Sequence, residues 1–193
     1  ENLALVLSLM VQSAGQDILF LPEATNCVSL DLTHQAQVLE SFDKIFFIEA
    51  ICEKAAELGL WVALGSISVA HYDKIHMFDV TLSTIERYHE SKSYRPGDTA
   101  VLAQTNWGGM GLSVCYDLRF PELYRVLAKA GARILIVPSA FALSTGGAHW
   151  HVLLRARAIE TGCFVIASAQ TGEHPVSGRK TYGHSLIVDP WGG

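Results

Sequence analysis

The chain has 193 residues, which is enough to bury a core and favours one domain, or two at most. Half of its residues are hydrophobic and 17% are charged, a composition that excludes a disordered chain. The net charge is −5 without a Lys/Arg cluster, which argues against a nucleic-acid partner, and no apolar run approaches the ~18 residues of a membrane span.

The first half of the chain alternates helical and strand patterns. Apolar residues at helical spacing predict a helix over residues 1–14 and another over 39–58, which Gly59 ends. The first of these apolar stretches is short and has no basic leader, so it does not fit a signal peptide. Apolar runs at 17–21 and 61–67 predict buried strands.

The second half repeats this alternation. Pro121 and Gly131 mark the start and end of one predicted helix, and a second covers residues 148–161 and ends before a glycine. The apolar runs of this half predict four further strands, over 110–115, 134–137, 163–169 and 185–188. Alternating strands and helices predict an α/β layered domain.

The cysteines show neither a CxxC pairing nor a metal-ligand spacing, which favours free thiols in a reducing cytoplasm. We therefore expect a cytoplasmic protein without a metal site. A lone cysteine is usually a small buried apolar residue, and this interpretation is kept for three of the four: Cys27, Cys52 and Cys163.

Two chemically reactive residues follow predicted strands, where α/β sheets gather their chemistry. Glu23 follows the first strand, and Cys115 ends a later one and precedes a turn. A nucleophile on a sharp strand-to-helix turn is exposed beside a backbone N–H, here that of Tyr116, which can serve as an oxyanion donor. The alternatives are a buried cysteine, a loop carboxylate at Glu23 and a solvated surface charge at Lys74, and spacing alone does not join these residues.

Three blocks of the sequence resemble the signature blocks of the nitrilase superfamily, the carbon–nitrogen hydrolases, and occur in the family's order. They are Leu-Pro-Glu at 21–23, the stretch 72–79 around Lys74 and the stretch 111–123 around Cys115. The later parts of the chain agree with this family and resemble its Nit-type branch most, so that the resemblance covers nearly the whole chain. These later blocks are 138–141, 149–150 with 154–160, and 182–190.

The resemblance implies a four-layer α-β-β-α sandwich, one domain over residues 1–193 that often pairs into homodimers or higher homo-oligomers. It also implies a triad of Glu23, Lys74 and Cys115, with Glu90 supporting the lysine and the substrate. No metal or organic cofactor is needed, because the partners of the reaction are a small amide and water.

The chemistry explains these residue types. Glu23 takes the proton of Cys115, whose thiolate attacks the amide carbonyl. The Lys74 ammonium and the Tyr116 N–H stabilise the developing oxyanion, and losing one such donor typically costs ~3–4 kcal/mol. Glu23 then protonates the departing ammonia and activates the water that cleaves the thioester.

Several other residues have both a binding and a structural interpretation. Arg119 either faces a substrate carboxylate or pairs with Asp117 or Glu122, and the pair is favoured. Phe141, Ala142 and His149 are candidates for the pocket wall. His149 and His184 suggest a Cys–His dyad, but the resembling family needs no histidine. Arg157 is expected to pair with Glu160 at i,i+3.

The resemblance favours an omega-amide of a dicarboxylic or 2-oxo acid as substrate, with deaminated glutathione first, omega-amides of other 2-oxo acids and N-carbamoyl amino acids next, and nitriles last. An α/β-hydrolase needs Gly-x-nucleophile-x-Gly, whereas Ser113 and Asp117 flank this cysteine. A catalytically silent binding protein is the remaining alternative.

The chain is shorter than the family's usual length. Family members carry an opening strand, further strands after the last residues, and one or two strands where this chain has residues 66–71. Missing strands would leave sheet edges exposed, so we expect segments to be missing at both ends and near 66–71.

Overall fold

The computed structural model describes residues 2–23, 25, 46–64, 70–84, 87–173 and 178–193. Two helices, α1 (Asn2–Gln12) and α3 (Phe46–Leu58), pack together and lie against a small parallel pair of strands, β1 (Ile18–Phe20) and β2 (Trp61–Ala63). Strand β1 ends just before Pro22 and Glu23, so it delivers the first predicted site residue.

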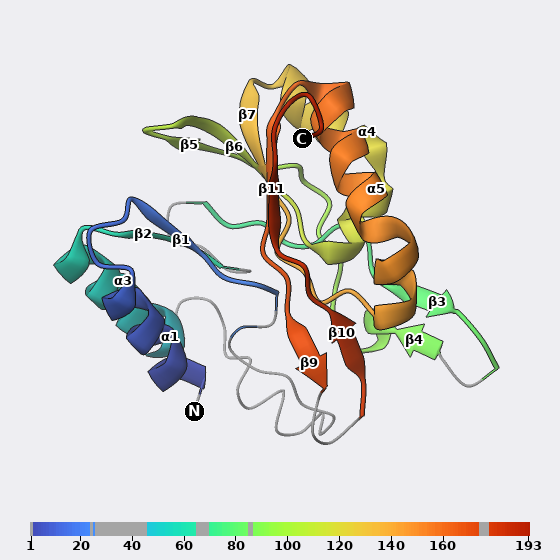
Figure 1. Ribbon diagram of the computed structural model, residues 1–193, viewed down its shortest axis with the longest axis horizontal. Coiled ribbons are helices and arrows are strands. Elements are labelled where there is room, and N and C mark those ends of the chain that lie inside the picture. The colour runs from blue at the N-terminus through green and yellow to red at the C-terminus, as the bar shows by residue number, and fades with distance from the viewer. Residues whose placement is uncertain (1, 24, 26–45, 65–69, 85–86, 174–177) are drawn as a thin grey trace.

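A five-stranded sheet forms the centre of the molecule (Figure 1). Its three inner strands are parallel and its two edge strands are antiparallel to their neighbours. In spatial order the strands are β11 (Leu186–Val188), β8 (Phe164–Ala167), β7 (Ala132–Ile136), β6 (Gly108–Leu112) and β5 (Leu102–Thr105).

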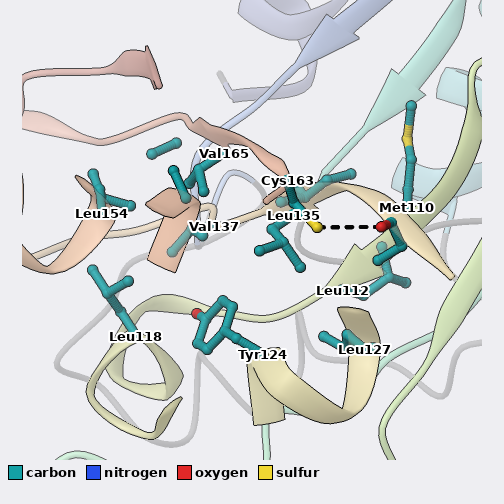
Figure 2. Close-up of a cluster of buried hydrophobic side chains, with 14 of the residues drawn as sticks. Met110, Leu112, Leu118, Tyr124, Leu127, Leu135, Val137, Leu154, Cys163 and Val165 are labelled. Carbon is teal, nitrogen blue, oxygen red and sulfur yellow. Dashed lines mark hydrogen bonds between the residues drawn. The ribbon is translucent and has the colours of Figure 1, made fainter. Parts of the chain in front are cut away.

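Two helices, α4 (Pro121–Lys129) and α5 (Leu143–Thr161), cover one face of this sheet (Figure 1). Side chains of the sheet and the two helices fill the main core, in which Leu135, Leu154 and Val165 are fully buried (Figure 2). Ala63 of β2 belongs to the same core, so the two sheets pack face to face. The order helix pair, sheet, sheet, helix pair confirms the predicted four-layer α-β-β-α sandwich.

Two antiparallel hairpins and two short 3₁₀ helices complete the described structure. They are β3 (Asp79–Thr81) with β4 (Arg87–His89), β9 (Thr171–Glu173) with β10 (Lys180–Tyr182), η2 (Glu90–Lys92) and η3 (Cys115–Arg119). Most residues of these hairpins are exposed or half-buried, so their hydrophobic alternation is too weak to predict them from sequence.

The predicted elements exist, but several of their bounds were wrong. Helix α5 begins at Leu143, before its predicted start at residue 148. The carbonyl of Ala142 accepts the amide of Gly146, and this hydrogen bond closes the first helical turn. Strand β6 ends at Leu112, so Cys115 lies in η3 and not in the strand. Residues 39–45 and 65–69, which carry parts of a predicted helix and strand, lie outside the described residues, as do Cys27 and most of the stretch 66–71.

Cys163 is 2% exposed in the main core, where its thiol donates to the carbonyl of Ala132 at 3.2 Å (Figure 2).

Within the described ranges, no helix is long and apolar enough to cross a membrane. The same part of the chain contains no group of three or more His, Cys, Asp or Glu side chains that could hold a metal ion.

Candidate active site

The turn that follows β6 places Cys115 in an uncommon backbone conformation. Its φ is 49°, in the left-handed region that few residues other than glycine adopt. Its own amide donates to the carbonyl of Pro138 at 3.0 Å, which ties the turn to the end of β7. Tyr116 follows at the start of η3, so the strand-to-helix turn expected for a nucleophile is present.

Glu23 reaches the same place from the end of β1. Its Oε1 lies 3.3 Å from Lys74 Nζ, and its Oε2 accepts the backbone N–H of Ala140 at 2.9 Å. The Glu23 carbonyl accepts Gln170 Nε2 at 2.6 Å, so the backbone is also held. Glu23 is therefore a fixed, mostly buried carboxylate, although it does lie in the loop that follows β1.

Lys74 lies between two carboxylates. Its Nζ is 2.8 Å from both carboxylate oxygens of Glu90 and 3.3 Å from Glu23, and its side chain is only 11% exposed. Burial lowers its pKa, but the carboxylates of Glu23 and Glu90, together with the thiolate form of Cys115, outweigh burial and raise the pKa well above its usual value. The side chain is a buried cation, so its interpretation as a solvated surface charge is wrong.

The thiol of Cys115 has a raised pKa. Burial is the main cause and the charge of Glu23 adds to it, while Lys74 and a hydrogen bond from the Ala140 backbone act in the opposite direction. Cys115 therefore rests as a thiol at neutral pH, with a carboxylate beside it that can accept its proton.

Arg119 makes neither of the pairs that the sequence favoured. Its two terminal nitrogens each donate to His149 Nδ1 at 3.3 Å, and its guanidinium lies 5.8 Å from the Tyr116 ring and 5.6 Å from the Phe141 ring. The expected pair with Asp117 fails because that carboxylate is completely buried and bonded to other groups.

The other predicted residues of the pocket wall divide into two groups. His149, on α5, and Phe141 both contact the Arg119 guanidinium, so they belong to the surroundings of this cation. Ala142 is 2% exposed and precedes the first turn of α5, where its carbonyl accepts the amide of Gly146. His184 Nδ1 is engaged with the carbonyl of Tyr182 at 2.7 Å, so both imidazoles of the proposed Cys–His dyad are engaged elsewhere.

The predicted pair of Arg157 and Glu160 is confirmed, at 2.8 Å. The Arg157 side chain has a second contact that its spacing does not reveal, because Nε and Nη2 both donate to the carbonyl of Leu118 at 3.1 and 2.8 Å. Arg157 thus fastens the far end of η3 to α5.

Three groups at the site escaped the sequence analysis. The Ala140 amide binds Glu23, and Asp117 joins the nucleophile turn to the lysine segment. Arg179 donates to the Ala140 carbonyl at 2.8 Å and lies 5.1 Å from the Tyr88 ring. Ala140 and Asp117 lie inside the family-like blocks, so the blocks were the available signal, whereas nothing in the sequence marks Arg179.

The carbon–nitrogen hydrolase family model matches residues 1–193, and the chain belongs to this family. The solved structure of the Caenorhabditis elegans NitFhit protein resembles it with a TM-score of 0.90 and 35% identity, covering 99% of this chain and 52% of that one.

Several curated relatives of this chain bear the name of one amidase. A deaminated glutathione amidase of Dictyostelium discoideum is 54% identical over 129 residues, which is 66% of this chain and 44% of that protein. The Yersinia enterocolitica deaminated glutathione amidase is 43% identical over 168 residues, 75% of this chain and 58% of that protein. The chain thus spans about half the length of these relatives.

Proposed function

We propose that this chain hydrolyses the C–N bond of a small amide through a thioester at Cys115. The observation that carries the proposal is the convergence of Glu23, Lys74 and Glu90 beside a thiol on a strained turn. Lys74 is a buried ammonium between two carboxylates and remains charged. Glu23 is the carboxylate beside Cys115 and can accept the proton of its thiol.

The steps follow from the contacts. Glu23 takes the thiol proton as the sulfur of Cys115 bonds to the amide carbon. The Lys74 ammonium and the Tyr116 N–H stabilise the oxyanion, and the amide of Cys115 itself is occupied by Pro138. Collapse of the intermediate breaks the C–N bond, and Glu23 gives the proton to the departing amine, which is ammonia when the amide is primary. Glu23 then removes a proton from water, whose oxygen attacks the thioester. The carboxylic acid leaves, and the proton returns from Glu23 to the sulfur of Cys115.

We infer that the substrate carries a carboxylate besides its amide. None of the ion pairs formed by the described residues engages Arg119, whose guanidinium is fixed by His149 and two aromatic rings. A guanidinium held in this way fits a substrate carboxylate through paired hydrogen bonds. Deaminated glutathione, an omega-amide of a 2-oxo acid, is the substrate we assign first, because several relatives bear its amidase as their name.

Release of the nitrogen-bearing product tests this function: deaminated glutathione gives cysteinylglycine, and the other three substrates of the panel give ammonia. The panel is deaminated glutathione, 2-oxoglutaramate, an N-carbamoyl amino acid and an aliphatic nitrile, each also with a Cys115→Ala variant. We expect deaminated glutathione to be the best substrate, with turnover abolished in the variant. Intact-mass spectrometry after rapid acid quenching is expected to show an acyl adduct on the native chain only.

A preference for 2-oxoglutaramate would instead assign an omega-amidase, and activity retained by Cys115→Ala would overturn the mechanism. No release from any member of the panel, with no acyl adduct, would overturn the amidase assignment in favour of a silent binding protein.

We further propose that residues 1–193 act as one carbon–nitrogen hydrolase domain, that the domain forms homodimers and that it works in the cytoplasm. Exposed apolar side chains support the dimer: Val152 and Ile159 lie on α5 and are 67% and 59% exposed, and Trp191 is 92% exposed. Cys115 and Cys163 are thiols, which suits a reducing compartment. Light scattering with a Val152→Glu variant tests the dimer, and cell fractionation tests the location.

A further inference from the structure

A third carboxylate, that of Asp117, lies behind the site and is fully buried. Asp117 has no exposed surface, and its two oxygens receive four hydrogen bonds. Oδ2 accepts the Tyr72 hydroxyl at 2.8 Å and the Val114 amide at 2.9 Å. Oδ1 accepts the amide and the Nδ1 of His76 at 3.0 and 2.7 Å. A buried carboxylate needs this number of donors to remain in place.

The donors come from two segments that meet at the reacting atoms. Val114 is the residue before Cys115, and Asp117 also returns its own amide to the Val114 carbonyl at 3.1 Å. Tyr72 and His76 lie on either side of Lys74 in the chain. One carboxylate thus holds the backbone that carries the nucleophile and the backbone that carries the ammonium.

Further contacts make this connection stiff. The His76 ring stacks on Phe120, just after η3, with ring centroids 3.6 Å apart and planes inclined by 7°. The Tyr72 hydroxyl accepts the Ile75 amide at 3.3 Å, and the Lys74 carbonyl accepts the Gly97 amide at 2.9 Å. Movement of the lysine segment relative to the turn would therefore break several bonds together.

We propose that Asp117 is a positioning residue for the amidase reaction: through Tyr72 and His76 it fixes where the Lys74 ammonium lies relative to the Cys115 sulfur. The inference rests on the proposed function, since it assigns Lys74 the role of oxyanion donor. A displacement of a catalytic group by ~1 Å can cost about 100-fold in rate. Asp117 itself transfers no proton and touches no substrate.

The test uses variants that keep the shape of the donors. Tyr72→Phe removes only the hydroxyl, and His76→Phe keeps a ring on Phe120 but loses the Nδ1 donor. His76→Asn restores a donor near the position of Nδ1 without the ring. Tyr124→Phe is the matched control, because Tyr124 is also a buried tyrosine whose hydroxyl bonds near the nucleophile strand, to Ser113 at 2.8 Å, but outside the Asp117 network.

We expect Tyr72→Phe and His76→Phe to lower kcat by roughly 10- to 100-fold with KM unchanged, because the lost alignment matters only in the transition state. His76→Asn is expected to recover most of kcat, and Tyr124→Phe to keep kcat near the native value despite a lower Tm. Equal losses of kcat in Tyr72→Phe and Tyr124→Phe, or no loss in His76→Phe, would overturn the positioning role.

Alkylation of Cys115 by iodoacetamide separates this proposal from the amidase assignment. Lys74 lowers the pKa of the thiol, so a displaced Lys74 slows alkylation even if no amide in the panel is turned over. We expect the two aromatic variants to be alkylated several-fold more slowly than the native chain and Tyr124→Phe. Unchanged alkylation rates in both variants would overturn the inference, whereas failure of turnover alone would overturn only the proposed function.

Discussion

Carboxylates hold the segment 72–78 at two places and in different ways. We call them the open group, which has two carboxylates, and the closed group, which consists of one carboxylate and its donors. In the open group, Glu23 and Glu90 face Lys74 with side chains that are 18% and 20% exposed. In the closed group, Asp117 faces Tyr72 and His76 and is not exposed at all. The open group balances two negative charges with one cation beside a thiol, and the closed group surrounds one negative charge with N–H and O–H donors.

The difference shows how one residue type serves two purposes in the same site. Carboxylates around Lys74 have a reactive neighbour and partial access to solvent, so they can exchange protons and meet substrate. The Asp117 oxygens are already occupied by four donors, so they fix geometry. We therefore expect substitutions in the open group to act mainly on rate, and those in the closed group to act on both rate and stability.

The largest expected effect is that of Glu23→Gln, which tests the open group directly. An amide cannot take the thiol proton, and losing a general base typically costs ~10²–10⁴-fold. We expect kcat for amide hydrolysis to fall by that factor, with little change in the free energy of unfolding measured by denaturant titration.

Glu122→Gln is the control for Glu23→Gln, since Glu122 is an exposed carboxylate in the first turn of α4. It is expected to behave like the native chain. If Glu23→Gln kept most of its activity, proton transfer would have to run through another group and the division between the two carboxylate groups would fail.

Lys74→Met is expected to lower kcat by ~10²–10³-fold, the usual cost of an oxyanion donor. It should also destabilise the fold, because Glu23 and Glu90 then face each other without a cation. The pKa of Lys74 in the folded chain lies above its unfolded value of about 10.4. Its charge therefore adds stability that is complete below that pH and declines as the pH rises toward the folded pKa.

The pH dependence of unfolding checks this sign. The difference in unfolding free energy between the native chain and Lys74→Met should stay constant from neutral pH up to ~10 and narrow above it. A difference that instead disappears on acidification through the neutral range would assign the stabilisation to another group.

The sequence predicts the large elements of this fold because their apolar spacing is strong. The strand before Glu23 is one uninterrupted apolar run, and helix α3 carries apolar residues at helical spacing, with Ile48 and Ile51 buried. Strand β5 and the hairpins β3–β4 and β9–β10 were missed, because most of their residues meet solvent and their pairing depends on contacts made elsewhere in the fold.

The contacts of the site also divide into those that the sequence predicts and those that it does not. Motif blocks predict which residues converge, and Glu23, Lys74 and Glu90 do meet. The blocks do not indicate which partner a given charge takes. Asp117, two residues from Cys115, was one of two expected partners of Arg119, with Glu122 the other, because sequence neighbours suggest local pairs. One of its actual partners, His76, is 41 residues away in the chain, and only the fold brings η3 and the lysine segment together.

Arg119→Gln probes substrate binding outside both carboxylate groups. Hydrogen bonds to a charged group are worth ~1.5–3 kcal/mol, so we expect kcat/KM for a carboxylate-bearing amide to fall by about 10- to 100-fold, mostly through KM. A neutral amide of the same length should be affected little. Arg155→Gln is the control, because Arg155 is exposed on α5. An equal loss for both amides would remove Arg119 from carboxylate recognition.

The smallest effect we predict is that of Gly97→Ala, which displaces the backbone of the segment 72–78 between the two carboxylate groups. A Cβ at residue 97 would clash with the carbonyl oxygen of Asp73, so the backbone next to Lys74 must shift. Overpacking of this kind typically costs ~1–3 kcal/mol, and we expect that loss of unfolding free energy together with a modest fall in kcat.

Gly147→Ala is the matched control for Gly97→Ala, because its nearest contact would be 3.8 Å from the Tyr182 ring and alanine is favoured in helix α5 by ~0.5–1 kcal/mol. It should raise stability slightly and leave kcat alone. If Gly97→Ala lowered stability without any change in kcat, the lysine segment could shift without harm, and the placement of Lys74 would depend on the open group alone. A fall in both would indicate that Lys74 needs the backbone fixed behind it as well as the carboxylates in front.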